Sequence, residues 1–434
     1  MTRKNLGTDF DAPSEKIQFN QTTANELDNA DQLANFRSKF VIEDPNLIYL
    51  DGNSLGRLPK KTKDLAQEIV SEQWGSRLIR SWNEKWLEDT VRIGDKVGSV
   101  VGAKQGEVVL ADSTTVCLFK AAVSVLLSNP TRSIILTDDQ NFPSDIQALK
   151  AAASMVSKDH KVVVIESNGL EAPVEELLEA IDETVALVSL SQVAYRSGCC
   201  WDLSTVTEKA HQVGSKVLWD LSHSVGVVPI DLRKDEIDLA IGCTYKYLNG
   251  GPGSPAFIYI SENCHDLINP IAGWYGSEDP FGFDPYSQPQ NDNRRFLTGT
   301  PPLVSTLLIE PGIDLVIEAG VQNIRSKSVA LSERFLFKAE KELLPLGFSV
   351  SSPLKHKNRG SHLSFSHDSA LAIGQALINE QSTIPDVRPP DLVRFGFAPL
   401  YNTFGEIEES IERVKEVIYG GGIDRWRDAT PVVP

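Results

Sequence analysis

Between residues 106 and 260, short apolar segments alternate with helical patterns, and this alternation constrains the fold more than any other feature of the chain. Helical patterns lie between several of the segments, including Val116–Leu127 and Val174–Ile181. Parallel strands require a crossover connection, which a helix usually provides. The sequence therefore predicts an α/β fold with a mostly parallel sheet sandwiched by helices. The expected strands are Glu107–Leu110, Ser133–Thr137, Lys161–Glu166, Ala186–Leu190, Lys216–Trp219, Asp238–Gly242 and Ala256–Ile260.

The pattern changes after Pro311. One long helical segment, 313–343, is interrupted in propensity only by Gly320, and a mixture of short strands and helices follows it. A chain of 434 residues is long for a single core. We therefore expect three parts: an N-terminal arm and joining segment (1–60), a large domain (61–310) and a smaller α+β domain (311–434). In the last part we expect strands at Phe348–Val350, His362–Phe365 and Leu392–Phe397, and helices at Ala370–Asn379 and Ile407–Val417.

Two local expectations concern the ends of the large domain. Residues 1 to about 35 are polar and acidic without a clear period, which is typical of an arm rather than a core segment. From Lys60 an amphipathic helix is expected, because Leu65, Ile69, Val70 and Trp74 fall on one face. The residues after Gly420 are expected to pack loosely.

Charge and cysteine content exclude several classes of protein. The net charge of −17 argues against binding to nucleic acid or to an anionic membrane through a basic surface. The residues 1–6 lack the apolar core of a signal peptide, and no apolar run reaches the length of a membrane span. The five cysteines form no C-x-x-C pair, and the adjacent Cys199 and Cys200 are poorly placed for a disulfide. We therefore expect a cytoplasmic protein without a structural metal.

Two polar residues stand at the ends of successive apolar segments. Lys246 follows Ile237–Ile241 and precedes a glycine-rich turn, and Asp220 follows Val217–Trp219. Burial disfavours the charged form of an amine, which is what a Schiff-base lysine requires. An aspartate and a lysine at such positions are the two anchors of pyridoxal phosphate, on the ring nitrogen and on the aldehyde. Lys246 taken alone is better explained as a solvated loop lysine, and it is Asp220 that favours the cofactor interpretation.

Other segments stay open between a functional and a structural interpretation. Thr114 and Thr115 begin a helix whose hydroxyls and free amides form an anion site, but ordinary N-capping explains them as well. Phe142 and Asp145 could stack on a planar ring and bond its substituents, or they belong to a capped turn. His223 is expected beside Asp220 or over a bound ring, or it is a core histidine.

Arg394 lies in the otherwise apolar segment Leu392–Phe397. An arginine in such surroundings must be paired, and a carboxylate is the partner that matches its geometry. The partner is either a protein Asp or Glu or the α-carboxylate of an amino-acid substrate.

Together these segments resemble the kynureninase family, pyridoxal-phosphate enzymes of the aspartate-aminotransferase fold (fold type I), and the bacterial branch most. The resemblance covers nearly the whole chain. It is carried by Tyr49–Gly56, Ser81–Asn83, Phe142–Asp145, Asp220–His223, Thr244–Asn249, Gly273–Gly276, Gly299–Pro302, Arg359–His362, Arg394–Phe397 and Pro399–Phe404. It implies a homodimer with sites at the subunit interface and hydrolysis of the Cβ–Cγ bond of L-kynurenine or 3-hydroxykynurenine to the anthranilate and L-alanine.

The resemblance also implies a role for each matching residue. Lys246 would form the Schiff base and remove the α-proton, Asp220 would hold the pyridine nitrogen, and Tyr245 would relay protons or only bind the phosphate. The cofactor would be contacted by Phe142, Asp145 and His223 at the ring and by Thr114, Thr115, Tyr245, Trp274 and Thr300 at the phosphate. Trp274 and Thr300 would come from the neighbouring subunit. The substrate would be contacted by Arg394 at its carboxylate, by Trp82 at its aryl group, and by Asn53 and Ser54.

Three residues depart from the family pattern: Ser277 replaces a usual histidine, Cys117 a common asparagine, and Gln192 a frequent histidine. Ser277 bears on the aryl pocket, so the substrate is less determined than the fold and the cofactor. A lyase or C–C hydrolase of the same fold acting on another amino acid is the alternative, although Cys199 and Cys200 do not form an obvious catalytic loop. A cofactor-binding protein without activity is disfavoured by the presence of Lys246, Asp220 and Arg394 together.

Overall fold

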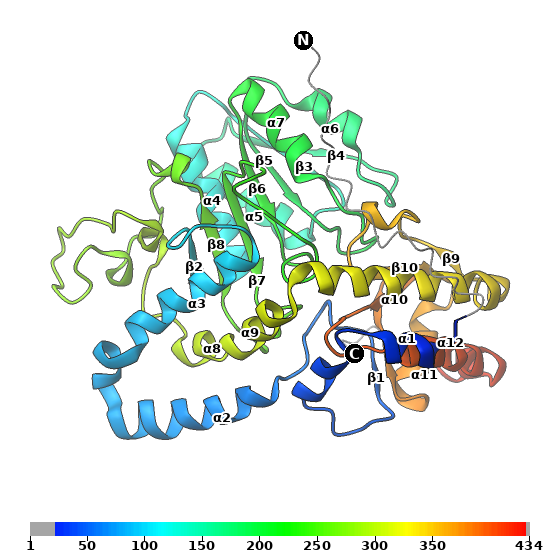
Figure 1. Ribbon diagram of the computed structural model, residues 1–434. Helices are drawn as coiled ribbons and strands as arrows, with labels where there is room; N and C mark the ends of the chain where they lie inside the picture. Colours follow the sequence, from blue (N-terminus) through cyan, green and yellow to red (C-terminus); the bar gives the residue numbers. More distant parts are fainter. Residues whose placement is uncertain (1–21, 431–434) are drawn as a thin grey trace, which may run out of the picture.

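The computed structural model describes residues 22–430 and is organised around a seven-stranded sheet (Figure 1). The strand order is β2-β8-β7-β6-β5-β3-β4. Strands β3 to β7 run parallel, whereas β8 is antiparallel to both of its neighbours. The predicted mostly parallel sheet is confirmed. The strands are β2 (Val108–Ala111), β3 (Ile134–Asp138), β4 (Lys161–Ile165), β5 (Val185–Ser191), β6 (Lys216–Asp220), β7 (Leu239–Cys243) and β8 (Ala256–Ile260).

Helices pack against this sheet because its inner strands are apolar on both faces. Strands β5, β7 and β8 are buried at every position, as expected for strands covered on both sides. Helix α4 packs against strands β5 to β8 and against α5, and α3 packs on β2. The helices of this part are α2 (Lys60–Glu68), α3 (Leu87–Val100), α4 (Thr114–Ser128), α5 (Pro143–Val156), α6 (Val174–Ala180), α7 (Leu203–Val213) and α8 (Leu303–Leu307).

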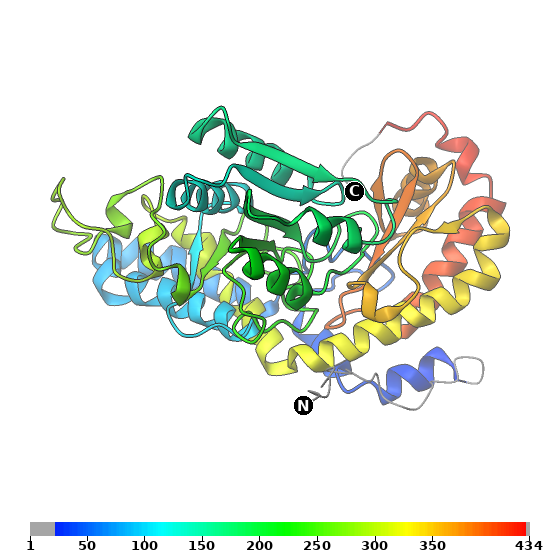
Figure 2. The ribbon, with the colours of Figure 1, turned by 90° about the horizontal axis from the view of Figure 1, so that it is seen from above.

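The long helical segment after Pro311 is broken at one residue. Helix α9 (Glu310–Ala319) ends at Gly320, and α10 (Val321–Glu342) begins directly after it. Gly320 adopts φ +77°, a left-handed conformation that glycine takes without steric cost. The chain therefore changes direction between the two helices, and α10 runs from the large sheet to the smaller unit of the chain (Figure 2).

The smaller unit contains a four-stranded antiparallel sheet in the order β12-β13-β10-β9. One face of this sheet packs Leu363, Phe365 and Phe395 against Phe335 of α10, forming a second hydrophobic core. The opposite face carries His362, Ser364 and Arg394. The elements are β9 (Ser349–Val350), β10 (His362–Ser366), β12 (Asp386–Arg388), β13 (Leu392–Gly396), α11 (Ala370–Glu380), α12 (Phe404–Tyr419) and α13 (Gly422–Arg425).

The N-terminal segment differs from the expected arm over the residues that the structure describes. Helix α1 (Ala24–Ala30) begins with a capping box between Thr23 and Glu26. Asp28 accepts hydrogen bonds from the Phe404 and Gly405 amides, at 2.7 and 2.9 Å, and so caps α12. Strand β1 (Ile48–Tyr49) then pairs with β11 (Thr383–Ile384). The expectation was wrong here because the contacts that order the segment lie more than 350 residues away in sequence.

At the other end, Ile423 and Trp426 pack against the second core, so the chain after Gly420 is not loose up to that point. Within residues 22–430, no helix combines the length and the apolar character that a membrane crossing requires.

Candidate active site

Lys246 and Asp220 meet at one edge of the large sheet. Asp220 is the last residue of β6, and Lys246 lies in the turn after β7, the neighbouring parallel strand. The Lys246 amine, Nζ, lies 2.9 Å from Nε2 of His223, which follows β6 in a tight turn. Parallel strands deliver the residues after their carboxyl ends to the same edge. We call Lys246, His223, Asp220 and Asp145 the polar cluster.

His223 is a neutral base in contact with the amine. Burial, together with the charges of Lys246 and Arg394, lowers the pKa of His223 well below its usual value. A neutral imidazole accepts a hydrogen bond through one nitrogen and donates through the other. Nδ1 of His223 is buried and has no partner among the described residues, so this nitrogen is available to a bound molecule.

Asp220 is held in place from its own turn. Its Oδ1 accepts hydrogen bonds from the Ser222 amide at 2.9 Å and the Ser222 hydroxyl at 2.6 Å. Its Oδ2 has only a long hydrogen bond, 3.4 Å, from the Ser191 hydroxyl. One carboxylate oxygen is therefore fixed and the other retains the capacity to accept a strong hydrogen bond.

Asp145 and Phe142 stand at the start of α5. Burial and the nearby Asp220 raise the pKa of Asp145 well above its usual value, and its Oδ2 has no partner within the described chain. The ring of Phe142 is 39% exposed and makes an edge contact with Tyr195, with ring centroids 5.1 Å apart. Phe142 thus offers an accessible aromatic surface beside two carboxyl groups.

Thr114 and Thr115 form the first turn of α4 at the same edge of the sheet. The residue before them, Ser113, is the N-cap, but its hydroxyl makes no capping hydrogen bond. The amides of the first turn are therefore left for another acceptor. This is the arrangement in which a helix start binds an anion.

Tyr245 precedes the lysine and keeps its proton at neutral pH. The adjacent Cys243 thiol and burial raise the pKa of Tyr245 above its usual value. Its ring lies under the Lys246 amine, 5.9 Å from Nζ to the ring centroid. The same thiol is the hydrogen-bond partner of the phenol.

Arg394 is fully buried and is paired with a protein carboxylate, Asp386. The two residues face each other in register across β12 and β13. Arg394 Nη2 also donates to the Ser54 hydroxyl at 3.0 Å, and Nη1 donates to the Tyr195 carbonyl. In the amide orientation that satisfies both groups, the Asn53 oxygen accepts from Arg394 Nε at 2.9 Å.

Arg388 is the second guanidinium of this group. Its Nε lies 2.9 Å from Asp386 Oδ2, and its Nη2 lies 3.5 Å from the Ser54 hydroxyl. Unlike Arg394, its side chain is one-third exposed. Two guanidinium groups thus share one carboxylate, and the buried Asp51 carboxyl lies close enough to interact with both of them. We call Arg388, Arg394 and Asp386 the arginine pair and its aspartate.

Sequence reasoning missed Asp386, Arg388 and the position of His362. Asp386 and Arg388 both lie in β12, just before the proline-containing turn that leads to β13, and a hairpin reading of 386–396 would have placed Asp386 opposite Arg394. His362 lies opposite Gly396 in β10, where a Cβ on Gly396 would overlap the Asn53 amide. Both ring nitrogens of His362 are buried without a partner in the described structure, and its ring centroid is 5.6 Å from that of His223.

Trp82 and Trp274 lie in a separate aromatic cluster. The ring centroids of these two residues are 5.6 Å apart, and both rings lie near Tyr275 and Phe281. Trp86 completes the group, 5.5 Å from Trp82. We call these five residues the aromatic cluster.

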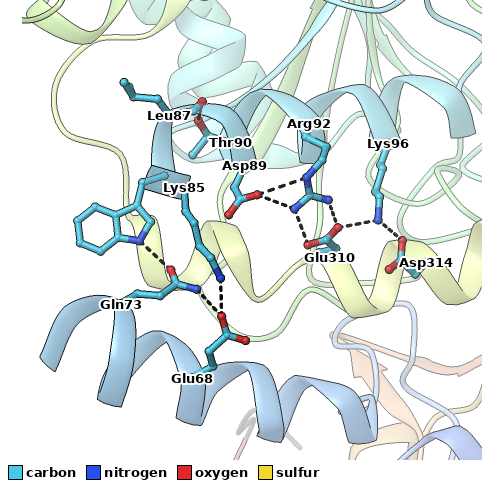
Figure 3. Close-up of polar contacts among 11 residues, drawn as sticks. Glu68, Gln73, Lys85, Leu87, Asp89, Thr90, Arg92, Lys96, Glu310 and Asp314 are labelled. Carbon is cyan, nitrogen blue, oxygen red and sulfur yellow. Dashed lines mark hydrogen bonds and ion pairs between the residues drawn. The ribbon is translucent and has the colours of Figure 1, made fainter. Parts of the chain in front are cut away.

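Polar contacts around α3 hold the aromatic cluster in place (Figure 3). Trp86 Nε1 donates to the Gln73 oxygen at 2.8 Å, and Gln73 in turn bonds Glu68 at 3.1 Å. Further along α3, Arg92 and Lys96 pair with Glu310 of α9. These contacts therefore fix the segment that carries Trp86 and the helix α3 that follows it.

The aromatic cluster does not converge with the polar cluster in one chain. The segment 270–290 that carries Trp274 and Phe281 lies on the side of the large sheet away from the smaller unit, in both ribbon views (Figures 1 and 2). Thr300 is exposed in the loop after this segment. Arg394 and His223, by contrast, lie between the large sheet and the smaller unit.

The polar cluster offers an amine and carboxyl groups. Phe142 adds an accessible aromatic face, and the first turn of α4 adds free amides at the same sheet edge. Together these groups can hold a planar aldehyde that carries an anionic group. Among the described residues there is no group of three or more His, Cys, Asp or Glu that could hold a metal ion.

Comparison with known proteins agrees with this geometry. Residues 324–414 match the domain family described as Kynureninase C-terminal domain. The kynureninase of Pseudomonas fluorescens is 39% identical over 92% of this chain and 96% of that protein. The solved apo structure of cysteine desulfurase from Thermococcus onnurineus NA1 has a TM-score of 0.76 at 18% identity, covering 89% of this chain and 98% of that one. A mutant of C-DES with glycine covalently linked to the PLP cofactor has a TM-score of 0.74 at 18% identity, covering 85% and 96%. The predicted fold type I architecture is confirmed.

Proposed function

This chain belongs to the kynureninase family, and we propose that it hydrolyses the Cβ–Cγ bond of L-kynurenine, 3-hydroxykynurenine or both, with pyridoxal phosphate as cofactor. The products are anthranilate or 3-hydroxyanthranilate and L-alanine, and the reaction consumes one water. One observation in the structure supports this most strongly. Lys246 and Asp220, from neighbouring parallel strands, lie at the same sheet edge, with the buried Arg394 guanidinium close enough to act on the pKa of His223.

The residues present fit the cofactor. Two buried polar atoms at the edge, Nδ1 of His223 and Oδ2 of Asp145, have no protein partner among the described residues. The first turn of α4 leaves its amides free for a phosphate. Lys246 would hold the aldehyde, Asp220 the ring nitrogen, Phe142 one ring face, and Thr114 and Thr115 the phosphate. When bound, the cofactor supplies an electron sink that makes proton loss at the substrate Cα and cleavage of Cβ–Cγ possible.

Lys246 is the base that moves the proton at the substrate Cα. Its amine lies against a histidine that burial keeps neutral, and a neutral His223 accepts a hydrogen bond from the amine without competing for its proton. Asp220, fixed by Ser222, would place its other carboxylate oxygen against the pyridine nitrogen and so favour the protonated ring. Lys246 would thus act as the base at the substrate Cα, and the Asp220 carboxyl would hold the cofactor ring at its nitrogen.

Tyr245 is the donor for later proton transfers. Its raised pKa keeps the phenol protonated at neutral pH, as a general acid or hydrogen-bond donor requires. The same phenol can instead donate a hydrogen bond to the phosphate. The two roles differ in the atom that receives the proton or the hydrogen bond.

The substrate carboxylate binds at the arginine pair. Arg394 is already held by Asp386, Asn53 and Ser54, which fixes its plane. Arg388, one-third exposed, would offer its remaining donors to the same carboxylate. A fixed guanidinium loses little freedom on binding, which favours affinity.

A homodimer would bring the aromatic cluster to the polar cluster of its partner. The exposed apolar side chains beside the aromatic cluster include Trp74, 60% exposed, and Ile79, 76% exposed. A groove of about 240 Å³ lies among Ile69, Trp74, Trp86, Leu303 and Val304. Contiguous exposed apolar groups of this kind mark protein contact surfaces. Trp82, Trp274 and Thr300 would then act on the partner's cofactor and substrate.

The five cysteines are free thiols, which supports a cytoplasmic location. Ser277 Oγ lies 2.7 Å from Ser287 Oγ in the loop that carries Phe281, so the departure at Ser277 concerns the shape of the aryl pocket, where kynurenine and its 3-hydroxy form differ.

The test is an assay of the purified protein with pyridoxal phosphate, comparing L-kynurenine with 3-hydroxykynurenine. Equal amounts of alanine and of the fluorescent anthranilate support the proposal, and the ratio of kcat/KM assigns the preferred ring. A protein that binds the cofactor and leaves both substrates intact would overturn the proposed reaction.

A further inference from the structure

Lys120 is a lysine with no exposed surface in the middle of α4, and the proposed chemistry does not use it. The helix around it is apolar. Burying an ammonium group is costly unless it is paired and hydrogen-bonded. A buried lysine at this position therefore depends on specific partners.

Both partners of Lys120 lie near the start of α4. Its Nζ donates to Oδ2 of Asp112 at 2.8 Å and to the backbone carbonyl of Phe296. Asp112 follows β2 and immediately precedes Ser113, the N-cap of α4. The lysine thus reaches from the second turn of the helix back to the turn that leads into it.

Asp112 has a backbone conformation that needs support. Its φ of +42° lies in the left-handed region, which is unusual for a residue other than glycine. Its carbonyl accepts a hydrogen bond from the Ala256 amide at 3.0 Å, and its carboxylate is held by Lys120. The direction in which the first amides of α4 point depends on this residue.

The second contact ties a distant loop to the same point. Phe296 is buried at the end of the short helix Asn293–Phe296. The chain continues to Thr298, whose carbonyl accepts from the Tyr275 amide at 3.0 Å, and then to Thr300. One side chain therefore connects the α4 start with the loop that carries Thr300.

We infer that Lys120 is a positioning residue for the cofactor phosphate: its ion pair with Asp112 sets the turn from which the amides and hydroxyls of Thr114 and Thr115 meet the phosphate. The inference rests on the proposed function, because it needs pyridoxal phosphate at this edge. It adds a residue outside the site that acts through Asp112 rather than by contact with the cofactor.

The test compares pyridoxal phosphate with pyridoxal, which lacks the phosphate, as ligands of the full-length apo protein. Lys120→Met is expected to weaken pyridoxal phosphate about tenfold, while pyridoxal changes less than about twofold. Both dissociation constants are measured by titration of the cofactor absorbance. Equal weakening of both ligands would mean that Lys120 only stabilises the fold, and the inference would be overturned.

Asp112→Asn provides the second variant, since Lys120→Met leaves a partly buried carboxylate unpaired. Asparagine tolerates positive φ well, and Lys120 keeps its contact with Phe296. The same loss of phosphate selectivity is expected, and the double variant should be no worse than the more affected single one, as for groups that act as a pair. Unchanged selectivity in Asp112→Asn would contradict the inference.

Lys327 offers a matched control, because it forms a buried ion pair with Asp31 at 2.7 Å in a different part of the chain. Lys327→Met is expected to lower stability and leave the ratio of the two dissociation constants unchanged. None of these measurements depends on kynurenine turnover, so a wrong substrate assignment would show in the assay above and leave this test intact.

Discussion

The polar cluster and the aromatic cluster differ in what one chain completes. The polar cluster is built from neighbouring strand ends and lies between the large sheet and the smaller unit, where burial lowers the pKa of His223 and raises the pKa of Asp145. The aromatic cluster is held by polar contacts around α3, and exposed apolar side chains such as Trp74 and Ile79 lie beside it. Exposed apolar side chains beside a largely buried aromatic group indicate a contact surface for a partner. The contrast predicts which residues act within a chain and which act across chains.

The polar cluster should fail completely when its amine is lost. Lys246→Ala is expected to lower kcat by at least about a thousandfold, because the base and the cofactor anchor disappear together. The bound cofactor should also lose the absorbance of its Schiff base. Lys158→Ala, an exposed lysine after α5, is the control and should behave like the parent protein. An unchanged spectrum in Lys246→Ala would refute the assignment of Lys246.

Mixing two inactive variants separates action within a chain from action across chains. Lys246→Ala and Trp274→Ala, unfolded and refolded together, should recover about a quarter of the parent activity, because half of the dimers are mixed and each has one intact site. Lys246→Ala with Arg394→Ala should recover none, since both residues belong to one chain's site. Activity is measured against the separate variants. Recovery in the second mixture, or its absence in the first, would reverse the contrast between the clusters.

Arg394→Ala should raise KM about a hundredfold with the cofactor retained, because a carboxylate anchor is lost and Asp386 loses a partner. Arg388→Ala should raise KM less, as its side chain is partly exposed. Steady-state kinetics and the cofactor absorbance are the two measurements. Loss of cofactor from Arg394→Ala would place this arginine in the cofactor site instead.

The smallest expected effect concerns His362. Its titration tests whether water reaches the face of the smaller sheet that carries His362 and Arg394. Burial, with Arg394 and Lys246 nearby, lowers the pKa of His362 well below its usual value. The unfolded chain therefore binds a proton on this ring below pH 6.5 that the folded chain does not bind, so stability falls as the pH is lowered. Between pH 7 and pH 5 the free energy of unfolding should fall by about 2 kcal/mol more in the parent than in His362→Gln. Urea unfolding at both pH values measures this difference, and equal losses would show that the ring is hydrated.

The seven strands of the large sheet and the positions of Lys246 and Asp220 followed from local pattern. Apolar segments of strand length separated by helical periods allow few arrangements, and residues directly after parallel strands reach a common edge. The strands of the smaller sheet that carry His362 and Arg394 were predictable for the same reason. The direction of β8 was not, because an antiparallel return has the same composition as a parallel strand.

Contacts between distant segments were beyond local pattern. The pairing of Arg394 was left open between a protein carboxylate and a substrate, and only the register of β12 against β13 selected Asp386. The order of α1 depends on the amides that begin α12. The face Leu65, Ile69, Val70 and Trp74 was periodic, yet Ile69 is buried and Trp74 exposed, since periodicity cannot tell an intramolecular core from a surface reserved for another chain.

The sequence by itself determined the sheet, the positions of Lys246 and Asp220 at neighbouring strand ends, and the family, because each depends on residues close together in the chain or on matching segments. The tertiary structure alone decided that Lys120, which binds Asp112, also reaches Phe296, 176 residues further along the chain than Lys120, and that Asp386 pairs with two arginines. Such pairs form where packing brings buried charges within reach of each other, and the energy of a buried charge depends on its partners in space rather than on its neighbours in sequence.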